Sequence, residues 1–165
     1  MYHRLYAHIA WTTRDRAPVI DARVARFLCR YFRGVARQER AQILEIGLVA
    51  DHVHLLVRLN PGTQLPRLIQ RCKGGSAVIA TRERHAAEDR QLRWGKGYSV
   101  HSISPRALPA VRTYLRTQAQ HHPSAAIPGW EGADAEFDPV SKDEWRAAPR
   151  TRVLSRSRTG ARSVH

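Results

Sequence analysis

Cysteine, lysine and acidic residues are scarce in this chain. Its 165 residues include two cysteines, 14 acidic residues and, among 28 basic residues, three lysines. Cys29 and Cys72 are not spaced as a redox or metal-binding pair, so neither a disulfide framework nor a cysteine-based zinc site is expected. No apolar run approaches the roughly 20 residues of a transmembrane helix, and the N-terminus lacks the apolar run of a signal peptide. We therefore expect a soluble, cytoplasmic protein that does not bind membranes.

Arginine, by contrast, is abundant. The formal net charge is +14 and the sequence pI is about 11.2. A cationic surplus of this size favours a polyanionic partner, because Lys and Arg side chains displace the counterions of phosphates. A coding bias toward arginine would explain the choice of Arg over Lys but not the net charge. The composition therefore predicts a nucleic-acid partner.

The predicted elements follow the order β-α-β-β-α-β, with one further helix. Apolar periodicity predicts strands at 3–12, 42–49, 52–59 and 98–103, and helices at 21–40, 64–84 and 109–121. This order is typical of the α+β, ferredoxin-like split βαβ fold, a four-stranded antiparallel sheet with helices on one face. In the third strand, alternate residues from Val53 to Leu59 should face the helices. His52 and His54 are then expected on the opposite, open face.

Residues 123–165 differ in composition from the rest of the chain. They contain four prolines and little periodicity, and the last sixteen positions carry five arginines and no acidic residue. We therefore expect a folded domain at 1–122 and a basic, flexible tail at 123–165. The tail either touches the DNA backbone without sequence preference or is inert.

Two short motifs carry the side chains best suited to chemistry. His52 and His54 share one face of a strand because they are two residues apart. Tyr114 and Gln118 share one face of a helix because they are four residues apart. Each pair also has an ordinary explanation, a solvated strand face or a half-buried helix position. Together, in a basic chain of this topology, they suggest a metal ion beside a phenolic nucleophile, and hence phosphodiester chemistry on DNA.

The chemistry of a phenol supports this interpretation. A free tyrosine has a pKa near 10, and a neighbouring cation favours the phenolate and polarises a phosphate oxygen. Tyrosine is also able to form covalent intermediates. Asp51 fits either a carboxylate that accepts an imidazole N–H or an ordinary hairpin-turn residue. By ligand chemistry alone, two imidazoles favour manganese or zinc over magnesium.

These motifs resemble the single-tyrosine transposases of the HUH nuclease superfamily, of the insertion sequence 200/605 type. The name HUH stands for His-hydrophobic-His, which His52-Val53-His54 matches, and Tyr114 to Gln118 matches the Tyr-x-x-x-Gln helix. Further similar blocks are Trp11-Thr12-Thr13-Arg14, Asp51 to Val57, Lys73-Gly74-x-Ser76 and Trp94-x-x-Gly97-Tyr98. The resemblance covers about residues 1–122, with all blocks in the same order.

The resemblance implies a concrete activity. Such enzymes cut and rejoin single-stranded, hairpin-containing DNA at the ends of insertion sequences. Tyr114 would attack the scissile phosphate, which gives a 5′-phosphotyrosine and a free 3′-OH. His52, His54 and Gln118 would hold a divalent ion, Mg²⁺ or Mn²⁺. The family also implies a homodimer in which the tyrosine helix of one subunit acts in trans, at the site of the other.

Residues that touch DNA are harder to select. The candidates for phosphate contacts are Arg14, Arg16, Arg71, Lys73 and Lys96, and Trp94 and Tyr98 are candidates for base stacking. A solvated charge or a core aromatic explains each of them equally well. Lys73 is the strongest candidate, because it belongs to a family-like block.

Four alternatives stay open. A domesticated family member that processes genomic palindromes would carry the same motifs. A non-catalytic, nucleic-acid-binding ferredoxin-like module would place aromatics on the open face, where this chain has His52, His54 and Arg58. A replication-initiation protein or relaxase would use the same chemistry within a larger domain. A hydrolytic zinc enzyme would need a third ligand, and no His, Asp or Glu has an obvious spacing for it.

Overall fold

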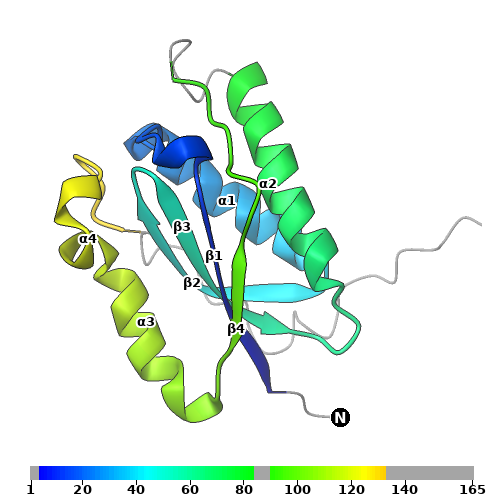
Figure 1. Cartoon of the computed structure of the whole chain (residues 1–165). Helices are drawn as coiled ribbons and strands as arrows, with labels where there is room; N and C mark the ends of the chain where they lie inside the picture. Colours follow the sequence, from blue (N-terminus) through cyan, green and yellow to red (C-terminus); the bar gives the residue numbers. More distant parts are fainter. Residues whose placement is uncertain (1–3, 84–89, 133–165) are drawn as a thin grey trace, which may run out of the picture.

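A four-stranded antiparallel sheet forms the centre of the protein (Figure 1). We describe it from a computed structural model that covers residues 4–83 and 90–132. The strands are β1 (Leu5–Thr12), β2 (Ala41–Val49), β3 (His52–Leu59) and β4 (Ser99–Ser102), in the spatial order β2-β3-β1-β4. This order and the element order along the chain confirm the predicted α+β, ferredoxin-like fold.

Two long helices, α1 (Ala22–Gln38) and α2 (Leu65–Arg82), pack against each other and cover one face of the sheet (Figure 1). Their apolar side chains and every second residue of the strands form the core, whose largest fully buried members include Phe32, Ile9, Leu28, Leu55 and Leu68. The Asp21 carboxylate caps α1 by accepting a 2.8 Å hydrogen bond from the Val24 amide. Val53, Leu55 and Val57 face this core as predicted.

The other face of the sheet is partly covered, which corrects the expectation of an open face. Helices α3 (Leu108–Arg116) and α4 (Gln118–His121) lie over β2 and β3 on the side away from α1 and α2 (Figure 1). Gly47 of β2 permits this approach, because a Cβ there would lie 2.9 Å from the carbonyl oxygen of Leu115. Leu56 and His52 are consequently buried on the covered face.

The predicted helix at 109–121 is interrupted at Thr117, where φ is −97° and ψ is 21°. The Thr117 hydroxyl donates a 2.9 Å hydrogen bond to the carbonyl of Thr113, an interaction that bends helices. The other elements begin and end within a few residues of their predicted bounds. Three short 3₁₀ helices, η1 (Arg14–Arg16), η2 (Pro105–Ala107) and η3 (Pro123–Ala125), complete the described secondary structure.

Packing against the domain continues beyond residue 122, the predicted end of the folded part. Ala50 donates a 2.7 Å backbone hydrogen bond to the carbonyl of Ala125. Ile127 is buried and Trp130 packs against the core. The predicted tail from residue 133 onward lies outside the described residues. Within the described parts of the chain, no helix is long and apolar enough to cross a membrane.

Candidate nuclease site

His52 and His54 lie side by side on β3, on the face that α3 and α4 partly cover. Their ring centroids are 5.1 Å apart and the rings are nearly perpendicular, at 75°. His52 is 6% exposed, and its Nδ1 lies 2.5 Å from Oδ1 of Asp51. Since a carboxylate can only accept, His52 donates through Nδ1 and keeps its Nε2 lone pair. Of the two interpretations of Asp51, the structure confirms the imidazole partner.

Gln118 reaches the same site from the first position of α4. Its side-chain Nε2 donates to Nε2 of His52 over 3.2 Å, and the residue is 2% exposed. Within the described residues, its Oε1 is buried and accepts no hydrogen bond. A buried acceptor without a partner is costly. This amide oxygen is therefore available to a ligand next to the imidazole of His52.

Tyr114 lies at the rim of the site, one turn before Gln118. Its side chain is partly exposed, with a relative accessibility of 37%. The ring is perpendicular to that of His54, at 89° and a centroid distance of 6.1 Å, and it stacks on the ring of His121 at 4.7 Å. The phenol is thus accessible to a large substrate while its ring is held on both sides.

Three further histidines lie near this pair, and the sequence motifs did not indicate that they belong to the site. His8 on β1 lies with its Nε2 2.8 Å from Nδ1 of His54. The rings of His122 and His52 have centroids 4.7 Å apart, and those of His101 and His8 are 6.4 Å apart. The alternation of β1 pointed to the correct face for His8. Only the strand register, which pairs Ala10 with His54, could have shown that the two rings meet.

Burial keeps the imidazoles of His8, His52 and His54 neutral. Desolvation, together with the neighbouring His52, His8 and His122, lowers the pKa of His54 to about 3. Burial also lowers the pKa of His52, although the hydrogen bond from its ring to Asp51 acts in the opposite direction. Burial and the charge of His101 lower the pKa of His8. Neutral imidazole is the form that binds metal ions.

The residues present fit a divalent metal ion. Within the described residues, no three His, Cys, Asp or Glu side chains form a metal-binding group, so the third ligand considered beside His52 and His54 is an amide oxygen. The buried, unpartnered Oε1 of Gln118 supplies that oxygen beside two neutral imidazoles. The pair Asp51–His52 has the arrangement of a carboxylate that orients a metal-binding histidine.

Lys73, the strongest predicted DNA contact, is engaged in a loop. Its ammonium donates to the carbonyls of Gly95, Lys96 and Gly97 over 2.8, 3.3 and 2.9 Å. Burial lowers its pKa. Beside it, the indole of Trp94 donates to Oγ of Ser76 over 2.9 Å. Hydrogen bonds therefore join the two family-like blocks, in α2 and at 94–98. They give Lys73 a structural role besides the predicted phosphate contact.

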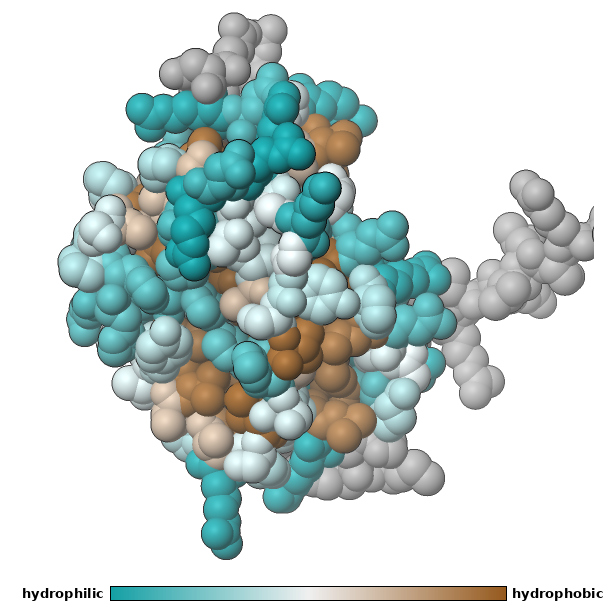
Figure 2. All heavy atoms as spheres, in the orientation of Figure 1, coloured by the Kyte–Doolittle hydropathy of each residue, from teal (hydrophilic) through white to brown (hydrophobic). Residues whose placement is uncertain are grey.

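The other predicted DNA contacts are at the surface. Arg14, Arg16, Lys96 and Tyr98 are exposed. Arg16 also pairs at 3.5 Å with the Asp51 carboxylate that holds His52. Arg71 is committed to Glu39 and Gln38. Figure 2 shows hydrophilic side chains over much of one face, with apolar patches between them.

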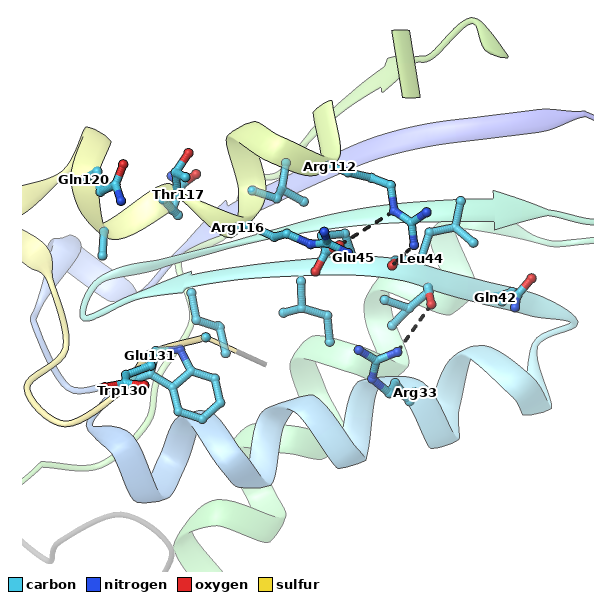
Figure 3. A pocket seen from close by; sticks show the side chains of 17 residues that line it. Arg33, Gln42, Leu44, Glu45, Arg112, Arg116, Thr117, Gln120, Trp130 and Glu131 are labelled. Carbon is cyan, nitrogen blue, oxygen red and sulfur yellow. Dashed lines mark hydrogen bonds and ion pairs between the residues drawn. The ribbon is translucent and has the colours of Figure 1, made fainter. Parts of the chain in front are cut away.

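A cavity of about 670 Å³ lies beside the site, between the free edge of β2 and the helices α3 and α4 (Figure 3). Glu45 pairs across it with Arg116 at 2.9 Å and with Arg112 at 3.7 Å. Arg112 also donates to the carbonyl of Leu44, and Arg33 to that of Ile43. The cavity shares Gln118 with the site but includes neither Tyr114 nor the histidines. The guanidinium groups of Arg33 and Arg112 donate hydrogen bonds to carbonyls of the edge strand β2. This arrangement disfavours pairing of that edge with another strand.

The fold and these side chains define a class of protein with an accessible tyrosine beside a largely buried His-His-Gln group. A family model described as "Transposase IS200 like" matches residues 1–118. This match spans more than half of the sequence, and the chain belongs to the IS200-like transposase family. A curated relative, the ISDra2 transposase TnpA of Deinococcus radiodurans, is 25% identical over 120 residues, which are 70% of this chain and 85% of that protein.

Solved structures agree with this assignment. A crystal structure of a protein assigned as a transposase from Deinococcus radiodurans is 25% identical and superposes with a TM-score of 0.56, covering 72% of this chain and 93% of that one. A REP-associated tyrosine transposase bound to a REP hairpin shares the fold, with a TM-score of 0.58, 14% identity, and coverage of 74% and 73%.

Proposed function

We propose that this chain is a single-tyrosine HUH transposase that cuts and rejoins single-stranded DNA in a metal-dependent reaction. One observation carries the proposal: the accessible ring of Tyr114 lies against His54, next to the buried pair of His52 and Gln118. A nucleophile, two neutral imidazoles and an unpartnered amide oxygen thus meet in a chain of a transposase family.

In the proposed reaction, the Oη atom of Tyr114 attacks the phosphorus of the scissile phosphodiester. The Oη–P bond forms while the bond from phosphorus to the 3′ oxygen of the preceding nucleotide breaks. The phenol gives up its proton, and the departing oxygen takes up a proton to become a free 3′-OH. The DNA remains attached as a 5′-phosphotyrosine, and attack by a 3′-OH rejoins the strand and releases the tyrosine. No nucleotide cofactor is consumed.

His52, His54 and Gln118 would hold the divalent ion, Mg²⁺ or Mn²⁺. When bound, such an ion polarises a phosphate oxygen and favours the phenolate form of the tyrosine. Asp51 keeps His52 in the tautomer whose Nε2 carries a lone pair, to which the Gln118 amide donates in this structure. The stacking of His121 and the contact with His54 limit the orientations of the Tyr114 ring.

The proposed substrate is single-stranded DNA that contains a hairpin. The net charge of +14 supports a DNA partner, and the REP-associated transposase with the same fold was solved with a hairpin bound. Phosphate contacts would come from the exposed Arg14, Arg16 and Lys96. Lys73 would add a contact only by giving up carbonyls of the 95–97 loop.

The proposed assembly is a homodimer, and the family resemblance implies that the tyrosine helix of one subunit acts in trans. The alternative arrangement is a tyrosine that serves the histidines of its own chain. A mixture of Tyr114→Phe and His54→Ala proteins separates the two arrangements. Covalent adducts in the mixture would establish action in trans, and their absence beside an active wild type would establish action within one chain.

A denaturing gel tests the proposed activity. The protein is incubated with single-stranded oligonucleotides from both strands flanking its own gene, with and without Mn²⁺ or Mg²⁺. We expect a metal-dependent covalent band that is missing in Tyr114→Phe. Tight DNA binding without any covalent band would favour a non-catalytic nucleic-acid-binding module instead.

A further inference from the structure

His8 is a half-buried neighbour of His54 that the proposed reaction does not use. Its Nε2 lies 2.8 Å from Nδ1 of His54, and the two rings are nearly parallel, at 19° and a centroid distance of 5.0 Å. The β1–β3 register places Ala10 opposite His54 and His8 opposite Leu56, so the rings meet on one face of the two central strands. The sheet backbone thus fixes this contact.

A hydrogen bond between two neutral imidazoles has a direction with chemical consequences. Each ring carries one N–H and one lone pair. If Nδ1 of His54 donates, its Nε2 keeps the lone pair and is able to bind a metal ion. If Nε2 of His8 donates, the proton of His54 sits on Nε2 and that ligand is lost. The partner of Nδ1 therefore decides whether His54 is a ligand.

For His52, a carboxylate determines which ring nitrogen carries the proton. Asp51 can only accept, so the Nδ1 proton of His52 is fixed and Nε2 faces the Gln118 amide. His54 has no carboxylate within the hydrogen bonds of the described residues; its Nδ1 partner there is His8. The two histidines of the pair are held by chemically different neighbours, Asp51 from the turn before β3 and His8 from β1.

We infer that His8 is a positioning residue: its Nε2 accepts the Nδ1 proton of His54 and so keeps Nε2 of His54 free for the metal ion. His8 does for His54 what Asp51 does for His52. The metal part of this inference rests on the proposed function. The tautomer of His54, by contrast, is a property of the chain alone and can be measured without metal or DNA.

The first experiment is long-range ¹H–¹⁵N NMR of ¹⁵N-histidine-labelled protein, which assigns the protonated nitrogen of each ring. We expect His54 to carry its proton on Nδ1 in the wild type and to lose this preference in His8→Leu. His8→Gln, whose amide oxygen still accepts, should restore it. His101→Leu removes an imidazole of the same face, one that has no hydrogen bond to His54 in the described structure, and should leave it unchanged. An Nε2-protonated His54 in the wild type would overturn the inference.

The second experiment is calorimetric titration of the same four proteins with Mn²⁺. Loss of a residue that orients a ligand typically weakens metal binding about 10-fold to 100-fold, so we expect Kd to rise by this factor in His8→Leu and to recover in His8→Gln. Equal affinities of the wild type and His8→Leu would refute the positioning role. A wild type that binds no Mn²⁺, but whose His54 tautomer depends on His8, would refute the metal site of the proposed function and leave the hydrogen bond intact.

Discussion

The two faces of the sheet are lined by side chains of different polarity. The face under α1 and α2 is closed by apolar side chains such as Phe32, Leu28 and Leu55. The face under α3 and α4 carries imidazoles and an amide, and its fully buried apolar side chains include Val49, Leu56 and Leu115. The first face stabilises the fold by apolar burial. The second buries polar groups at a cost, which is expected where they serve a ligand.

The strongest test of this contrast is a change that abolishes chemistry without affecting stability. In Tyr114→Phe the loss of the phenolic oxygen should eliminate covalent DNA adducts. The free energy of unfolding should change by no more than about 0.5 kcal/mol, because the side chain is partly exposed. Gel assays and urea unfolding measure the two effects. Tyr98→Phe, at another exposed tyrosine, is the control, and adducts persisting in Tyr114→Phe would exclude this nucleophile.

On the face under α1 and α2, a substitution should reduce stability without abolishing adduct formation. Phe32 is completely buried between α1 and the sheet, against Trp11. Its replacement by alanine should reduce the free energy of unfolding by about 3–5 kcal/mol, through lost burial and the cavity left behind. Urea titration measures this loss. Adduct formation per folded molecule should remain, and a selective loss of activity in a stable Phe32→Ala protein would show that the faces are not separable.

Gly47 of β2 lies where α3 packs on the sheet, so its substitution should affect both stability and adduct formation. In Gly47→Ala the new Cβ would meet the Leu115 carbonyl at 2.9 Å, so α3 has to move. We expect a stability loss of about 1–3 kcal/mol and a fall in adduct formation of up to about 100-fold, because a displacement of 1 Å near reacting groups has this effect. Gly34→Ala, with nothing within 4 Å, is the matched control and should preserve activity. Unchanged activity in Gly47→Ala would mean that α3 docking does not place Tyr114.

The smallest expected effect concerns Asp51. In Asp51→Asn the hydrogen bond to His52 loses its charge but not its geometry, so the Kd for Mn²⁺ should rise about tenfold. Arg16→Gln removes the exposed partner of the same carboxylate and is the control for surface charge. Calorimetry compares the two variants. Equal affinity in Asp51→Asn and the wild type would restrict Asp51 to its role in the hairpin.

Much of the fold was predictable from local pattern. Alternation in β3 correctly assigned Val53 and Leu55 to the core and the two histidines to the opposite face. The continuous helix at 109–121 was not correct, because periodicity does not register the hydrogen bond by which Thr117 bends the chain. The burial of Lys73 among loop carbonyls also escaped detection, since its partners lie more than 20 residues away in the sequence.

The order of the elements, the cationic composition and the residue types of the site follow from the amino-acid sequence, because they depend on composition and on spacings of two and four residues. Which of these residues meet depends on the fold. The contact of His8 with His54 depends on strand register, and the contact of Tyr114 with His54 depends on a helix that docks at Gly47. Both result from packing between segments distant in the chain, a long-range interaction that no local spacing encodes.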